Sequence, residues 1–276
     1  MIKLTNVTKC YARSSVKAVD NLTLEIHGGE IFGFIGPNGA GKSTTIKMIT
    51  GILAPTAGTV EIDGVDVRQN PTLAKSFIGF VPDNHETYET LKGIEYLNFI
   101  GTMYNVDGAT LKSKIQEYAT LFQMTDALGK MVASYSHGMK QKLMIIAALI
   151  HSPKVWVLDE PMTGLDPQSS FQLKQLMRRY ADQGNTVFFS SHVIDVVEKV
   201  CDRIGIINHG KLVAVDTLDN IRADKSVSLE SIFLTMTSDA TATVAPASTD
   251  TSSTPKTPSQ PEISPQNDTS REENDK

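Results

Sequence analysis

The residues from Gly36 to Thr44 have the types and the spacing of a phosphate-binding loop. They read GPNGAGKST, follow the apolar run IFGFI and precede a helical pattern, which is the context that this motif requires. Lys42 can reach the β- and γ-phosphate oxygens of a nucleotide, and the Ser43 hydroxyl can ligate magnesium. We therefore expect a magnesium nucleotide to be bound by Gly36, Pro37, Asn38, Gly39, Ala40, Gly41, Lys42, Ser43 and Thr44.

Two adjacent carboxylates supply the chemistry that a phosphate-binding loop lacks. Asp159 and Glu160 end the run VWVLDE, so a buried strand would place both at one edge of a sheet. Asp159 can hold the magnesium shell, and Glu160 can orient or deprotonate the water that attacks the γ-phosphate. His192, after the run TVFFSS, is a candidate γ-phosphate contact, although a lone histidine is more often structural. These residues predict nucleotide hydrolysis, with Lys42, Glu160 and His192 as the catalytic set.

A sheet with crossover helices must bring these residues together, and the chain alternates short apolar runs with helical patterns accordingly. Short connections between the early strands suit an antiparallel layer, whereas the strands beginning at Ile31, Val155 and Thr186 suit a parallel core. The fold class is α/β: a P-loop NTPase core with a parallel sheet, an N-terminal antiparallel β layer and a helical subdomain over about 86–134. The predicted strands are 2–7, 19–26, 31–35, 58–62, 78–81, 155–158, 186–190, 204–208 and 211–215, and the predicted helices are 42–50, 91–104, 111–122, 137–150, 167–180 and 193–200.

Composition indicates one folded unit followed by a tail. Residues 1–237 carry the apolar runs, whereas 238–276 are rich in Ser, Thr and Pro and are predicted to be a disordered acidic tail. Most of the net charge of −5 lies in that tail, so no broad basic face for nucleic acid is expected. No run approaches the roughly 18 apolar residues of a membrane span, and no secretory signal is visible. Cys10 and Cys201 are single and suggest neither a disulfide framework nor a metal site.

The order of these motifs resembles the ATPase subunit of an ATP-binding cassette (ABC) transporter, over about residues 1–236. That resemblance implies ATP and Mg²⁺ as cofactors. It also implies that Tyr11 stacks on adenine, although a strand-end aromatic packed against the core remains an alternative. On matching positions it implies Walker A at 36–44, the family signature at 136–140, Walker B Asp159, catalytic Glu160, the D-loop at 164–166 and the switch histidine His192.

The signature explains why one chain would be insufficient. Ser136 and Gly138 lie at the predicted start of a helix, so a hydroxyl, backbone amides and the helix dipole point toward an anion. The resemblance implies that this anion is the γ-phosphate held by a second subunit. We therefore expect a homodimer or heterodimer of ATPase subunits that ATP holds together, bound to an integral membrane permease subunit. The chain would lie in the cytoplasm, peripheral on the inner face of the cell membrane.

Two positions depart from the family pattern. The usual signature L-S-G-G-Q is replaced by YSHGM, which keeps the serine and one glycine but loses the glutamine amide. After the strand 78–81 the family places a glutamine, whereas this chain has Pro82-Asp83-Asn84. Asp83 can ligate magnesium directly or through water, and we expect it to replace that glutamine as the sensor of nucleotide. Asn84 in that role is the alternative.

Partner and direction of transport are predicted from two further segments. Tyr88, Leu91, Ile94, Leu97 and Phe99 combine helical spacing with aromatics, which is compatible with a groove for a short helix of another protein, or with an ordinary core. The segment 228–234 and the SHGMKQK run resemble export-type subunits. The alternative is a soluble ABC ATPase that acts on nucleic acid or ribosomes, but its paired cassettes, coiled-coil insertions and zinc modules are not seen.

Overall fold

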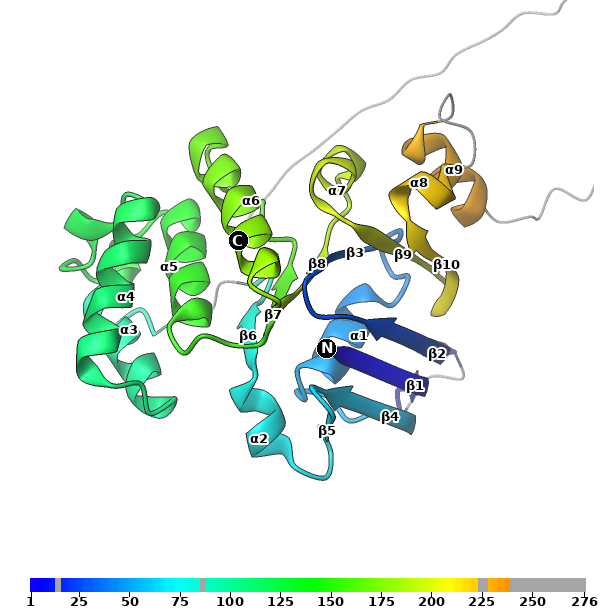
Figure 1. Ribbon diagram of the computed structural model, residues 1–276, viewed down its shortest axis with the longest axis horizontal. Coiled ribbons are helices and arrows are strands. Elements are labelled where there is room, and N and C mark those ends of the chain that lie inside the picture. Colours follow the sequence, from blue (N-terminus) through cyan, green and yellow to red (C-terminus); the bar gives the residue numbers. More distant parts are fainter. Residues whose placement is uncertain (13–15, 85–87, 223–227, 239–276) are drawn as a thin grey trace, which may run out of the picture. The chain divides into compact units, whose positions relative to one another are not determined.

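The computed structural model describes residues 1–12, 16–84, 88–222 and 228–238 (Figure 1). Its central sheet has six strands in the order β10-β9-β3-β8-β7-β6. The strands from β9 to β6 run parallel, and only β10 at the edge is antiparallel to its neighbour. They span β3 (Ile31–Ile35), β6 (Ile78–Val81), β7 (Val155–Asp159), β8 (Thr186–Ser190), β9 (Arg203–Asn208) and β10 (Lys211–Thr217).

A second sheet forms the predicted antiparallel layer. Its order is β2-β1-β4-β5, and all of its pairs are antiparallel. Within it β1 pairs with β2 over a longer stretch than the apolar pattern indicated, because β1 continues through polar residues to Cys10. The strands are β1 (Ile2–Cys10), β2 (Lys17–Ile26), β4 (Ala57–Ile62) and β5 (Val65–Asp66).

Alternate residues of the central strands enter two different cores, because successive side chains point to opposite faces of a sheet. In β7, Val155 and Val157 join the core shared with the antiparallel layer, whereas Trp156 and Leu158 join the core shared with α3 to α6. In each of the strands β3, β7 and β8, all five residues are buried. The parallel strands therefore read as continuous apolar runs, as strands covered on both faces do.

Helices cover these faces and connect the strands (Figure 1). The group α3, α4 and α5 packs at the edge of the sheet formed by β6, while α1 follows β3 directly. The helices are α1 (Lys42–Ile49), α2 (Pro71–Ser76), α3 (Gly93–Met103), α4 (Gly108–Leu121), α5 (His137–Leu149), α6 (Pro167–Asp182), α7 (Ile194–Val200), α8 (Leu218–Ile221) and α9 (Leu229–Thr237), with 3₁₀ turns at Thr125–Ala127 and Val132–Ser134.

Several elements were not predicted from the pattern. The strand β5 and the helices α2, α8 and α9 are short, and the three helices start at side-chain caps rather than at long apolar repeats. The side chains of Asn70, Thr217 and Ser228 accept hydrogen bonds from backbone amides at the starts of α2, α8 and α9. Asp107 likewise caps α4, which begins at Gly108 and not at the predicted residue 111.

The predicted tail at 238–276 lies, except for Ser238, outside the described residues, and so do the loop positions 85–87. In the part of the chain that the structure describes, no helix has the length and apolarity to cross a bilayer.

Candidate nucleotide-binding site

The phosphate-binding loop connects the end of β3 to the start of α1. Gly41 precedes α1 with φ of 111°, and a Cβ there would lie 2.5 Å from the Ala18 carbonyl oxygen. This left-handed conformation and close approach require glycine. The loop is also anchored from β9 and β10, because the Gly210 amide donates to the Ala40 carbonyl at 2.8 Å. The backbone around the predicted phosphate position is therefore fixed by the fold.

Lys42 lies in the loop with its ammonium group turned back over the backbone. Its Nζ donates to the carbonyls of Gly36 and Pro37 at 2.6 and 3.2 Å. Burial lowers the pKa of Lys42, whereas the nearby charges of Glu160 and Asp159 raise it. The side chain therefore holds a positive charge where loop amides and a phosphate group can meet.

Asp159 ends β7 and Glu160 follows it at the carboxyl edge of the sheet. The side chain of Asp159 accepts a hydrogen bond from Ser190 Oγ, and the Glu160 amide donates to the same Oγ at 3.2 Å. Burial raises the pKa of Asp159 and the charge of Asp83 adds to that rise, whereas hydrogen bonds from Ser190 and Ser43 lower it. Ser190 thus joins both carboxylate residues, and the motif order alone did not reveal this role.

Glu160 has φ of 50°, an uncommon left-handed conformation for a residue other than glycine. His192 lies beside it: Nδ1 is 2.9 Å from Glu160 Oε2, and the His192 amide donates to that oxygen at 3.4 Å. Strained backbone persists where surrounding contacts over-determine it, and such positions cluster at functional sites. The structure therefore brings the two residues together from β7 and from the turn after β8.

Most of the predicted phosphate ligands line one pocket with the carboxylates. Lys42 is the cation among the lining residues, and Asp83, Asp159 and Glu160 are the anions. Gly36 and Ala40 are buried in the loop and support it without lining the pocket. The lining residues are Ala18, Pro37, Asn38, Gly39, Gly41, Lys42, Ser43, Thr44, Asp83, Asp159 and Glu160.

Tyr11 lies next to this pocket. Its hydroxyl is 3.3 Å from Thr44 Oγ1, and the side chain is 45% exposed. An aromatic ring that is half open to solvent can stack on a nucleotide base, which a ring enclosed in a core could not do. The alternative of a core-packed aromatic is therefore disfavoured.

Ser136 and Gly138 do not line this pocket. Ser136 precedes α5, and its Oγ accepts a hydrogen bond from the Met139 amide at 3.3 Å, so it caps the helix. The predicted placement at a helix start is observed. Within a single chain, however, these residues are not gathered with the loop and the carboxylates.

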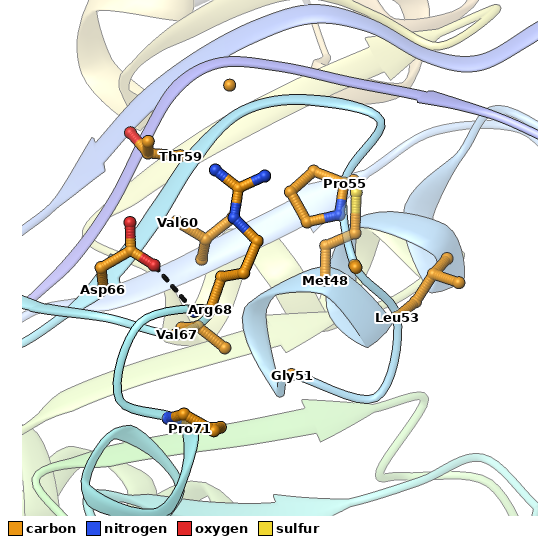
Figure 2. Close-up of a pocket in the computed structure, with 12 residues that line it drawn as sticks. Met48, Gly51, Leu53, Pro55, Thr59, Val60, Asp66, Val67, Arg68 and Pro71 are labelled. Carbon is orange, nitrogen blue, oxygen red and sulfur yellow. Dashed lines mark hydrogen bonds between the residues drawn. The ribbon is translucent and has the colours of Figure 1, made fainter.

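A second pocket lies at the other end of α1 and contains none of the predicted site residues (Figure 2). Its walls are mainly apolar, with Met48, Leu53 and Val60 among them, and the Arg68 side chain extends across it. The Asp66 carboxylate there accepts hydrogen bonds from the backbone amides of Arg68 and Gln69. That carboxylate therefore stabilises a turn, and the pocket lacks convergent groups for phosphate chemistry.

A divalent cation fits the oxygen donors of the phosphate pocket. Hard cations such as Mg²⁺ take hydroxyl and carboxylate oxygens, which Ser43, Asp159 and Asp83 provide. Among the residues that the structure describes, no three His, Cys, Asp or Glu side chains form a self-sufficient metal centre. A cation here would therefore complete its shell with water and with phosphate oxygens of a nucleotide.

The fold and the site define a P-loop nucleotide hydrolase. Residues 19–163 match the family model described as ABC transporter. Linearmycin resistance ATP-binding protein LnrL of Bacillus subtilis is 36% identical over 217 residues, which cover 79% of this chain and 69% of that protein. The chain belongs to the ABC transporter family, in which it is an ATP-binding subunit and an ATP hydrolase.

Solved structures agree with this assignment. The ATP-binding subunit of an ABC transporter has a TM-score of 0.82 at 29% identity, covering 86% of this chain and 99% of that one. A dimeric ATP-binding cassette in a post-hydrolysis state with ADP and phosphate has a TM-score of 0.71 at 27% identity, covering 79% and 99%. The predicted family and fold class are thus confirmed.

Proposed function

We propose that this chain hydrolyses Mg-ATP to power a membrane permease that exports its cargo, and that it lies on the inner face of the cell membrane. The observation that carries the proposal is the position of Glu160. Its carboxylate lies at the edge of the phosphate pocket, 2.9 Å from the His192 ring. Glu160 orients or deprotonates the attacking water, and His192 contacts the γ-phosphate and holds Glu160 in place.

The charges of the pocket support Mg²⁺ as the cofactor. Three carboxylates face one ammonium group, so a nucleotide polyphosphate would meet a net repulsive site without a cation. Ser43 and Asp159 hold the ion, and Asp83 contributes directly or through water. Lys42 and the loop amides bind the β- and γ-phosphates, while Tyr11 stacks on the adenine.

A second ATPase subunit completes the site. Ser136 and Gly138 lie away from the pocket of their own chain, at the start of α5, where amides and the helix dipole favour an anion. They contact the γ-phosphate bound by the partner subunit. The solved dimeric cassette with ADP and phosphate supports this arrangement.

The permease docks on an aromatic surface of the helical region. Tyr88 and Phe99 are 61% and 42% exposed, and their rings meet edge to face at 5.8 Å. An exposed aromatic pair suits the apolar side of a short helix. Asp83, which lines the phosphate pocket, senses the nucleotide. Export is supported by the resistance function in the name of the linearmycin relative.

The test of the hydrolytic role is Glu160→Gln. Replacing the carboxylate with an amide removes the base, so hydrolysis should fall by about 10²- to 10⁴-fold while ATP binding is retained. Phosphate release and equilibrium ATP binding, each measured with Mg²⁺, separate the two effects. Unchanged hydrolysis would remove Glu160 from its proposed role.

The sensor role of Asp83 needs the complete transporter. Asp83→Ala should lower both basal ATP hydrolysis and transport in membranes that contain the permease. If both stayed at the wild-type level, Asp83 would not be the sensor, and Asn84→Ala would test the alternative. Copurification from membranes, with identification of the integral partner, tests the assembly itself.

A further inference from the structure

His137 is the signature residue at which this chain departs from the family glycine, and it is the first residue of α5. The residue that it faces is Gly164, in the loop that follows Glu160. A Cβ placed on Gly164 would lie 2.2 Å from His137 Cδ2 and 2.9 Å from its Nε2. The imidazole ring is therefore seated directly against the Gly164 backbone.

Gly164 must be glycine for two reasons. Its φ is +76°, which side chains rarely adopt, and the ring of His137 occupies the space of a Cβ. The adjacent Gly138 is equally close, because a Cβ on it would lie 2.5 Å from the Gly164 carbonyl oxygen. The start of α5 and the loop at Gly164 are thus in backbone-to-backbone contact.

The next turn of α5 contacts both ends of the loop 161–166. Gln141 is fully buried, and its Nε2 donates to the Pro161 carbonyl at 2.9 Å. Lys142, whose side chain is 14% exposed, pairs with Asp166 at 2.9 Å. The loop 161–166 therefore cannot shift far without moving α5.

The loop is also short and internally bonded. The Thr163 amide donates to the Glu160 carbonyl at 3.2 Å, and the Leu165 amide donates to the Met162 carbonyl at 3.3 Å. These turns connect the position under His137 to the backbone of Glu160 within a few residues. A displacement at Gly164 would reach the strained φ of Glu160.

We propose that His137 is a positioning residue for hydrolysis. By packing on Gly164, it holds the loop 161–166, which follows Glu160, against the start of α5. This inference rests on the proposed function, in which the start of α5 contacts ATP of the partner subunit. Binding of the partner subunit's ATP at that helix start would then change the position of Glu160 in the same chain. The route consists of packed side chains and hydrogen bonds, which can carry energetic coupling between sites.

The test compares His137→Ala with His137→Gln in the full chain. Loss of the ring should lower kcat for ATP hydrolysis by about 2- to 30-fold, the range found for residues that transmit coupling without touching a ligand. KM for ATP and the melting temperature should stay at the wild-type values. His137→Gln, which restores a planar group of similar reach, should recover most of kcat. Ser134→Ala serves as the control, because its hydroxyl bonds Met131 before the signature.

Two outcomes separate this inference from the proposed function. If the wild-type chain hydrolyses ATP but His137→Ala keeps its full kcat, His137 has no positioning role. A fall in kcat that came only with a lower melting temperature, and that His137→Gln did not recover, would indicate a merely structural residue and also overturn it. If the wild-type chain itself hydrolyses no ATP, the proposed function fails first. ATP-dependent dimer formation by the Glu160→Gln variant checks that function independently.

Discussion

Removal of the Ser190 hydroxyl tests the geometry of the carboxylate pair. Asp159 and Ser190 are register partners in the parallel pair β7–β8, so the strands bring them side by side at the carboxyl edge of the sheet. The hydroxyl donates to Asp159 and accepts from the Glu160 amide. Ser190→Ala removes both interactions while leaving a small side chain that the buried site accommodates.

The expected magnitude follows from the bond to the Asp159 carboxylate. A hydrogen bond to a charged group contributes about 1.5–3 kcal/mol. At 1.36 kcal/mol for each factor of ten, kcat/KM for ATP should fall by about 10- to 150-fold. Because the bond from Ser190 lowers the pKa of Asp159, its loss should also shift the acid limb of the pH–rate profile to higher pH.

The assay is steady-state phosphate release with Mg²⁺ as a function of ATP concentration and pH. Ser191→Ala is the matched control, since the neighbouring hydroxyl accepts from the Val193 amide at 3.1 Å. This control should retain more activity than Ser190→Ala, because the Ser191 hydroxyl, although also buried, bonds the Val193 amide and neither carboxylate. A Ser190→Ala enzyme as active as the Ser191→Ala control would refute the reasoning.

Three further predictions concern Tyr11, Gly41 and His151. Tyr11→Ala should weaken ATP binding by about 1–3 kcal/mol in equilibrium titrations, whereas Tyr11→Trp should preserve it. If Tyr11→Ala bound ATP as tightly as the wild type, stacking would be excluded. Gly41→Ala should abolish ATP binding, because its Cβ would meet the Ala18 carbonyl; retained binding would contradict this. Burial lowers the pKa of His151 from 6.5 to about 4. Between these pH values the unfolded chain therefore binds more protons than the folded chain. The free energy of unfolding should fall by up to about 3 kcal/mol as pH drops from 6.5 to 4. His151→Phe, which can still stack on Tyr104, should flatten that slope in denaturant melts; an unchanged slope would assign it to other groups.

The sequence was informative where function depends on consecutive residues. The loop 36–44 and the Asp159–Glu160 pair could be predicted because each lies at the carboxyl end of an apolar strand. The two strands, β3 and β7, have the predicted bounds to within a residue. The α/β class followed from the same alternation. These features are local, so their spacing is visible in one dimension.

Contacts between distant segments were not predictable in the same way. Ser190 is 31 residues from Asp159, and only the β7–β8 register places its hydroxyl on that carboxylate. Nothing in the run TVFFSS distinguishes its two serines. Similarly, Gln141 reads as a polar residue on a helix, yet it is buried against the Pro161 carbonyl. Such roles depend on tertiary register, which a periodic pattern does not encode.

Asp83 adds a negative charge to the pocket, which an amide side chain at that position would not do. Each carboxylate near the γ-phosphate position raises the electrostatic cost of binding a nucleotide, and Asp83 also raises the pKa of Asp159. A divalent cation reverses that cost, since it is attracted by the same charges that repel phosphate. In the proposed function, nucleotide and cation therefore bind as one unit, and Asp83 would respond when hydrolysis changes the charge of that unit.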